Sequence, residues 1–110
     1  VGDFNDQPRD YSLRNDFTHD FFNASERNDF GPGTACFKNK WVVFDQILLD
    51  ENLMNSERLN YKSAGIYNPP YLIETIGRHK GSPKRSFRGR RFQNGYSDHF
   101  PVYALFDVTH

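Results

Sequence analysis

The sequence is short of cysteine, of long apolar runs and of net charge. Cys36 is the only cysteine among 110 residues, so no disulfide can form within the chain. No apolar stretch approaches the roughly 18 residues of a membrane-spanning helix, and we expect no membrane span. Lysine plus arginine and aspartate plus glutamate number 14 each, which excludes a chain that is basic throughout and binds nucleic acid by bulk charge.

What the chain has is enough apolar content to fold. Leucine, isoleucine, valine and phenylalanine make up about a quarter of it, above the level typical of disordered chains. Apolar residues on both faces predict a covered strand over Trp41–Leu49, and alternation predicts another over Phe100–Val108. A short strand is expected at Tyr61–Tyr67, and short helices at Arg9–Phe17 and Asp20–Ala24.

Polar residues interrupt or flank these apolar segments at three places. They are Asp3 and Asn5 in the opening GDFN, Asp45 inside the first strong strand, and the pair Asp98 and His99 just before the last strand. Taken singly, the first two could be turn formers, Asp45 an exposed edge residue and His99 a structural histidine. Taken together, carboxylates and a carboxamide are hard oxygen ligands for Mg²⁺ or Mn²⁺, and a carboxylate beside a histidine can handle protons. Metal and polar donors around a phosphoryl group can hydrolyse a phosphoester.

These segments resemble motifs of a known family. GDFN at 2–5, FDQIL at 44–48 and SDHFPV at 97–102 are similar, in order and spacing, to the last three motifs of the endonuclease/exonuclease/phosphatase family. That family includes pancreatic-type deoxyribonucleases and apurinic endonucleases. The resemblance spans essentially the whole chain.

The resemblance implies a role for each polar residue. Asp3 would orient or deprotonate the attacking water and could touch the metal, and Asn5 would hold the phosphate and could also be a metal ligand. Asp98 would be a metal ligand. His99 would donate to a phosphate oxygen, and Asp45 would orient His99. The implied cofactor is Mg²⁺ or Mn²⁺, and the substrate a phosphoester of nucleic acid, lipid or sugar.

The resemblance also implies an α+β fold. We expect residues 1–110 to form the C-terminal half of a four-layer α/β sandwich, with a mostly antiparallel sheet and short flanking helices. The chain starts at a strand end without a methionine, so we expect the N-terminal half of the domain to lie in a longer protein. The isolated chain is then expected to be inactive, and to dimerise or to associate with that half through its exposed inner face.

A basic segment lies between residues 77 and 95, which contains seven of the fourteen lysines and arginines. Its glycines and proline predict a long loop, and Arg88, Arg90 and Arg91 are candidate substrate-binding residues. Phe87 and Phe92 alternate with them, a pattern that can follow a phosphate backbone and stack on bases. Two alternatives to an enzyme therefore stay open: a non-catalytic nucleic-acid-binding domain and an interaction module that keeps the fold.

The implied contact between Asp45 and His99 gives a topological prediction. If the two side chains meet, the strands Trp41–Leu49 and Phe100–Val108 are expected to be neighbours in one sheet.

Overall fold

The computed structural model describes residues 1–10, 21–27 and 29–109, and every strand pair among them is antiparallel. The pairs are β1 (Gly2–Asp3) with β5 (Asp45–Gln46), β2 (Phe21–Asn23) with β6 (Leu48–Asp50), β3 (Ala35–Phe37) with β4 (Lys40–Val42), β7 (Leu59–Ile66) with β10 (Val102–Val108), and β8 (Phe87–Arg88) with β9 (Arg91–Phe92). The helices are short: η2 (Ala24–Glu26), α1 (Glu51–Met54) and η3 (Pro70–Leu72). The expected antiparallel character is confirmed, and the four-layer sandwich stays a prediction.

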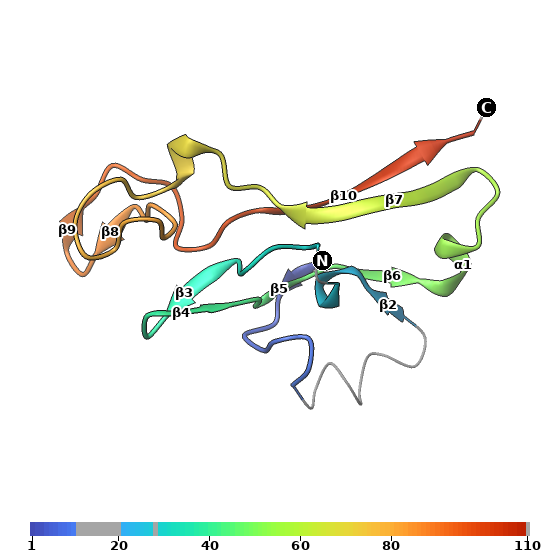
Figure 1. Cartoon of the computed structure of the whole chain (residues 1–110), viewed down its shortest axis with the longest axis horizontal. Coiled ribbons are helices and arrows are strands. Elements are labelled where there is room, and N and C mark those ends of the chain that lie inside the picture. The colour runs from blue at the N-terminus through green and yellow to red at the C-terminus, as the bar shows by residue number, and fades with distance from the viewer. Residues whose placement is uncertain (11–20, 28, 110) are drawn as a thin grey trace.

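The core lies between two layers of strands. Figure 1 shows the long β7–β10 pair lying along the row of short pairs formed by β1 to β6. Ile47, between β5 and β6, Leu49 of β6 and Ala64 of β7 are buried. Together with Ala24 and Phe30 they form one apolar cluster. This packing fixes β5 and β6, because removing apolar side chains from water is the main stabilising term in a fold.

The β7–β10 pair is the longest regular element. It runs from Val102 opposite Ile66 to Val108 opposite Leu59, with a bulge between Leu105 and Phe106. The sequence prediction of a strand at 61–67 is confirmed with slightly different bounds. Val102, Ala104 and Phe106 alternate toward the core, as the period of a half-buried strand requires.

The predicted strand Trp41–Leu49 is wrong as a single element. It is divided into the end of β4, then β5, then β6, and each piece pairs with a different partner. Strand β10 pairs with β7, so the expectation that residues 41–49 and 100–108 are sheet neighbours is also wrong. Residues 43–44 and Ile47 lie outside the strands and separate β4, β5 and β6, whose backbone hydrogen bonds go to different partner strands.

The helix predictions have mixed outcomes. The expected helical turn at 20–24 is wrong, because residues 21–23 form β2 and the 3₁₀ turn η2 begins only at Ala24. Asn23 caps η2 by accepting a hydrogen bond from the Ser25 backbone N–H. Most of the predicted helix 9–17, and Asp20, lie outside the described residues.

The segment from 73 to 98 is mostly irregular, as predicted, and contains the small β8–β9 pair and an isolated antiparallel bridge between Ile73 and Pro83. It forms one end of the molecule in Figure 1. Among the described residues, no helix has both the length and the apolar character needed to cross a membrane.

Candidate active site

Three predicted residues from distant segments converge. Asp3 and Asp45 lie opposite each other in the β1–β5 pair, and the Asp45 Oδ2 atom lies 2.7 Å from His99 Nδ1. One potential ligand atom of each residue lies within 4.8 Å of the others. The Asp45 and His99 side chains are only 17% and 22% exposed, so their hydrogen bond is partly shielded from water. The predicted meeting of Asp45 with His99 is therefore confirmed.

A tight turn fixes the Asp3 carboxylate. Asp3 Oδ1 accepts a 2.9 Å hydrogen bond from the Asn5 backbone N–H, an aspartate turn that leaves the second oxygen for other partners. Asn5 has a φ of +54°, a conformation that asparagine tolerates better than most residues. The Phe4 N–H donates to the Phe44 carbonyl at 2.9 Å, which continues the β1–β5 pairing past its end.

Two buried hydroxyl groups hold the backbone of Asp45. Thr34 Oγ1 accepts from the N–H groups of Phe44 and Asp45 at 3.2 and 3.3 Å. Ser25 Oγ donates to the Asp45 carbonyl at 3.5 Å and accepts from the Ile47 N–H at 2.9 Å. Strand β5 has only two residues, so these side chains supply much of the order that a longer ladder would give.

The residue after Asp45 is a buried amide that connects the segments around the site. Gln46 is fully buried, and its Nε2 donates to the carbonyls of Asp6 and Val43 at 3.0 and 2.5 Å. Its Oε1 accepts from Asn23 Nδ2 at 3.3 Å. Gln46 thus links β2, the segment after β1 and the residues just before β5. Each of its polar side-chain atoms has a hydrogen-bond partner, as burial requires.

Thr34 also guides the chain to His99. Its carbonyl accepts from the Phe100 N–H at 2.7 Å, and Ala35 forms an isolated antiparallel bridge with His99. A Cβ at Gly33 would approach the Trp41 Cβ and the Val42 backbone to about 2.9 Å, so glycine permits this close contact. Thr34 therefore binds the backbone N–H of Asp45 and that of Phe100, the residue after His99. It is a positioning residue for the Asp45–His99 pair.

Asp98 and the basic candidates are not members of the group of Asp3, Asp45 and His99. Asp98 is exposed and lines a neighbouring pocket of about 260 Å³ together with Arg88. Arg90 and Arg91 are exposed in and beside the β8–β9 turn and do not line that pocket. The metal role of Asp98 and the substrate role of the arginines stay predictions.

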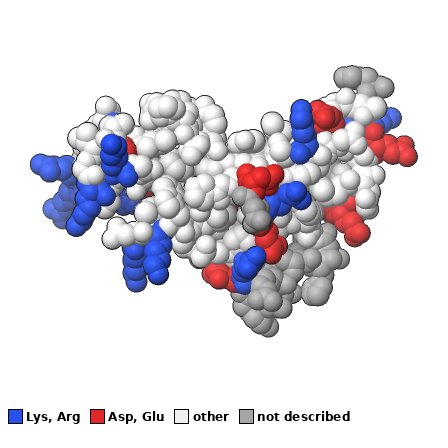
Figure 2. Space-filling view, viewed as in Figure 1, with Lys and Arg blue, Asp and Glu red and all other residues white. Residues whose placement is uncertain are grey.

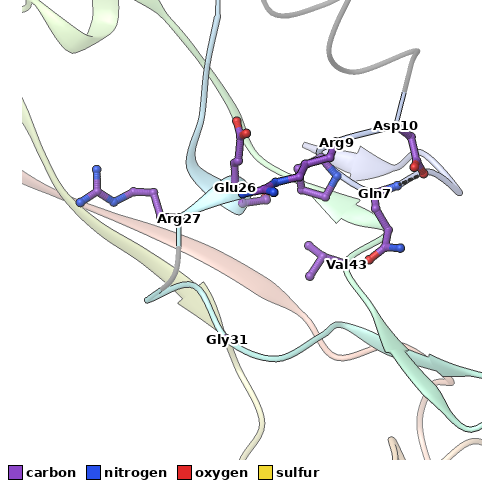
Figure 3. Close-up of a pocket in the computed structure, with 9 residues that line it drawn as sticks. Gln7, Arg9, Asp10, Glu26, Arg27, Gly31 and Val43 are labelled. Carbon is purple, nitrogen blue, oxygen red and sulfur yellow. Dashed lines mark hydrogen bonds between the residues drawn. The ribbon is translucent and has the colours of Figure 1, made fainter.

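Two further cavities differ in their relation to the site. A pocket of about 230 Å³ is lined by Asp45 and His99 and walled by Leu72 and Tyr96, so it adjoins the candidate acid–base pair. A pocket of about 380 Å³ lies between the 7–10 and 25–27 segments, and Figure 3 shows the hydrogen bond from the Gln7 N–H to Asp10 in its wall. None of the predicted site residues lines this larger pocket.

The donor set suits a hard divalent ion that keeps several water ligands. Asp3 Oδ2 and Asp45 Oδ1 take part in neither of the two hydrogen bonds described for these carboxylates. Mg²⁺ prefers six oxygen ligands and commonly keeps water on several of them. Asp3 and Asp45 could hold such an ion, and the His99 side chain lies beside them.

The fold and these residues define an antiparallel protein with a carboxylate–histidine pair in a partly buried site. The model of the Endonuclease/Exonuclease/phosphatase family matches residues 1–107, and the chain belongs to this family. The resemblance found in the sequence is thereby confirmed. Neither a curated protein nor a solved structure gives a match.

Sequence analysis missed the residues that hold the site together. Thr34, Ser25 and Gln46 are buried polar residues whose partners are backbone groups of β5 and its neighbours. Gln46 inside an apolar stretch was the available signal, because a buried amide needs several partners. Thr34 and Ser25 lie in segments that read as ordinary loop, and nothing local distinguishes them.

Proposed function

We propose that this chain carries part of the active site of a divalent-metal-dependent phosphoesterase. The observation that supports this most strongly is the convergence of Asp3, Asp45 and His99 within 4.8 Å from three separate segments. Family membership supports a phosphoesterase or nuclease type of fold. A half-buried carboxylate in an apolar segment is costly unless it is paired, and here its partner is a histidine that can transfer protons.

The Asp45–His99 pair sets the chemistry of the imidazole. With Nδ1–H donating to Asp45, Nε2 donates a hydrogen bond only when the ring is protonated, and accepts a proton when it is neutral. The carboxylate therefore fixes which ring nitrogen carries the hydrogen in the neutral imidazole. We assign His99 Nε2 to a non-bridging phosphate oxygen, where negative charge grows in the transition state, and Asp45 to holding the ring in this orientation.

The local turn at Asp3 supports a role for its carboxylate in binding water. Its Oδ1 is fixed by the Asn5 N–H, and the same turn places Asn5, an exposed amide, beside the site. We assign Asp3 to orienting the attacking water, and Asn5 to donating to the phosphate. A bound Mg²⁺ or Mn²⁺ would polarise the phosphoryl oxygens and neutralise their charge.

The test is hydrolysis by the complete protein of bis(p-nitrophenyl) phosphate and p-nitrophenyl phosphate, with Mg²⁺, with Mn²⁺ and with chelator. We expect metal-dependent turnover that His99→Ala lowers by about 10²–10³-fold, the usual cost of removing one preorganised donor. Asp107→Asn is a suitable control, because Asp107 is exposed in β10 and pairs only loosely with Lys62 at 3.9 Å. Absence of turnover on both esters under all metal conditions would favour the non-catalytic alternatives.

A further inference from the structure

A second pocket beside the catalytic group is unusually rich in cations. Its volume is about 260 Å³, and Lys38, Arg85 and Arg88 line it together with His79 and Asp98. Three permanent cations thus face one carboxylate. Figure 2 shows a group of lysine and arginine side chains at the end of the molecule where Figure 1 places β8 and β9, while most of the acidic residues seen in this view lie toward the middle and the other end.

One wall of the pocket is a tight hairpin turn. Phe37 pairs with Lys40, and the two residues between them, Lys38 and Asn39, have φ values of +50° and +63°. Positive φ at both central residues is typical of the two-residue turn that suits the twist of a hairpin. Lys38 Nζ lies 5.3 Å from the centre of the Phe37 ring, so an aromatic face supports the ammonium group at this turn.

The other wall is held by close backbone packing. The Lys84 N–H donates to the Leu72 carbonyl and the Tyr96 N–H to the Lys84 carbonyl, both at 2.8 Å. A Cβ at Gly95 would collide with the carbonyls of Lys84 and Arg85, so only glycine fits there. This packing places Arg85 in the wall, and its Nε atom is buried without a hydrogen-bond partner among the described residues. A guanidinium N–H that is buried without an acceptor is costly, so the donors of Arg85 are incompletely satisfied in the free pocket.

The pocket adjoins the catalytic group through the chain itself. Asp98 lines it, and the next residue, His99, forms the hydrogen bond to Asp45. Phe44 also lies between the two: its ring centre is 6.4 Å from that of Phe37, which lines the pocket, and 6.5 Å from that of His99.

We propose that this pocket binds a second phosphate group of the substrate, next to the one that is hydrolysed. The proposal rests on the proposed function for the position of the first phosphate, but the cation-lined pocket stands on its own geometry. Arginine presents a planar set of donors that matches phosphate oxygens, and lysine adds a point charge. The negative charge of Asp98 repels an anion. We therefore expect the phosphate to bind nearer to Lys38 and Arg85 than to Asp98.

The first test compares two substrates in the complete protein. One is p-nitrophenyl thymidine 5′-phosphate, and the other carries an additional 3′-phosphate. We expect the additional phosphate to raise kcat/KM at least about tenfold, since a charge-assisted hydrogen bond contributes more than 1.4 kcal/mol. The double variant Lys38→Gln, Arg85→Gln should remove most of this ratio, whereas the matched variant Arg58→Gln, Lys62→Gln, which changes two exposed cations outside the pocket, should retain it.

The second phosphate could belong to a nucleic-acid strand or to a small bisphosphate. A parallel pair, fructose 6-phosphate and fructose 1,6-bisphosphate, distinguishes these sources. If the ratio of kcat/KM with and without the second phosphate falls in the Lys38→Gln, Arg85→Gln variant, the site is supported. The substrate pair in which it falls identifies the class of molecule that supplies the second phosphate. The same ratio in wild type and in the pocket variant, for both pairs, would overturn the proposal.

A binding measurement separates this site from catalysis. Inorganic pyrophosphate is titrated by calorimetry into the complete protein without divalent metal. We expect binding that the pocket double variant weakens at least about tenfold and that His99→Ala leaves in place. Pyrophosphate binding without hydrolytic activity would refute the proposed function and keep the anion site, while binding equal in wild type and in the pocket variant would refute the site.

Discussion

Asp45 and His99 lie 54 positions apart in the chain, and their side chains are joined by a 2.7 Å hydrogen bond. No strand pairing connects their segments, because β5 pairs with β1 and β10 pairs with β7. The connection runs through Thr34, which binds the Asp45 N–H with its hydroxyl and the Phe100 N–H with its carbonyl. The geometry of the pair therefore depends on a loop residue that takes no part in the chemistry.

The first prediction concerns the two members of this pair. Asp45→Asn should lower kcat less than His99→Ala does, because asparagine can still accept from Nδ1–H while the loss of the imidazole removes the donor itself. The Nδ1 proton resonance of His99 should move in Asp45→Asn, which reports the changed partner directly. Asp107→Asn should change neither quantity, because Asp107 pairs with Lys62 in β10. A loss in Asp45→Asn greater than in His99→Ala would contradict this order and would show that holding a metal ion, the other role open to Asp45, outweighs its orientation of His99.

The second prediction concerns Thr34. Thr34→Val keeps the shape but leaves the Phe44 and Asp45 N–H groups without their buried acceptor. We expect the free energy of unfolding to fall by about 1–3 kcal/mol, the cost of unsatisfied buried polar groups. Urea denaturation measures this loss, and kcat measured well below the transition should also fall because Asp45 is no longer held in place.

Thr34→Ser is the matched control for that prediction. Serine retains Oγ and loses only a methyl group, so most of the stability and of kcat should return. If valine and serine variants behaved alike, the hydroxyl would not be what positions Asp45, and the backbone contacts of Thr34 would suffice.

Part of the site could be predicted from the sequence. The resemblance of the motifs around Asp45 and His99 to those of the family implied that the two side chains meet, and they do. The route by which they meet could not be predicted. Apolar alternation over 41–49 is the same for one long strand and for three short strands in different pairs, because the choice depends on β1, β2 and β3 elsewhere in the chain.

The basic segment shows a second limit of sequence reasoning. Nothing in the sequence distinguishes Arg88 from Arg90 and Arg91 as a candidate. Of these three, only Arg88 lines the pocket that contains Asp98. Lys38 and Arg85 join it because a hairpin turn and the packing of Gly95 bring them there. Such contacts depend on tertiary packing, which single-sequence patterns do not encode.

The third prediction concerns Gln46. Gln46→Leu would remove, at a fully buried position, the amide that donates to the carbonyls of Asp6 and Val43 and accepts from Asn23. Each unsatisfied group costs about 1–3 kcal/mol, partly offset by the apolar replacement, so we expect a net loss of at least about 2 kcal/mol in unfolding free energy. Gln7→Leu, at an exposed position, should change stability by less than about 0.5 kcal/mol in the same urea titration. Equal stability of the Gln46 variant and wild type would contradict the anchoring role of this amide.

The fourth prediction concerns the protonation of His79 in the cation-lined pocket. Burial lowers the pKa of His79 below 6.5, and the charges of Arg88, Arg78 and Arg85 lower it further, while Glu74 opposes them. Lys38 and Asp98 line the same pocket and contribute charges of opposite sign. The free pocket therefore holds a neutral imidazole at pH 7, and lowering the pH through and below 6.5 protonates it. A bound anion stabilises the imidazolium, so it must raise the pKa of His79, and by linkage the anion must bind more tightly as the pH falls through this range.

Sulfate is the suitable probe, because it does not titrate in this range as phosphate does. An NMR titration of the His79 ring protons from pH 4.5 to 8, without and with sulfate, should show the pKa moving upward when sulfate is present. In Lys38→Gln, Arg85→Gln the upward movement should shrink, because the anion is held less tightly, whereas Arg58→Gln, Lys62→Gln should behave as wild type. A His79 titration that sulfate leaves unchanged in the wild-type protein would mean that no anion enters the pocket, and the second phosphate site would have to be abandoned.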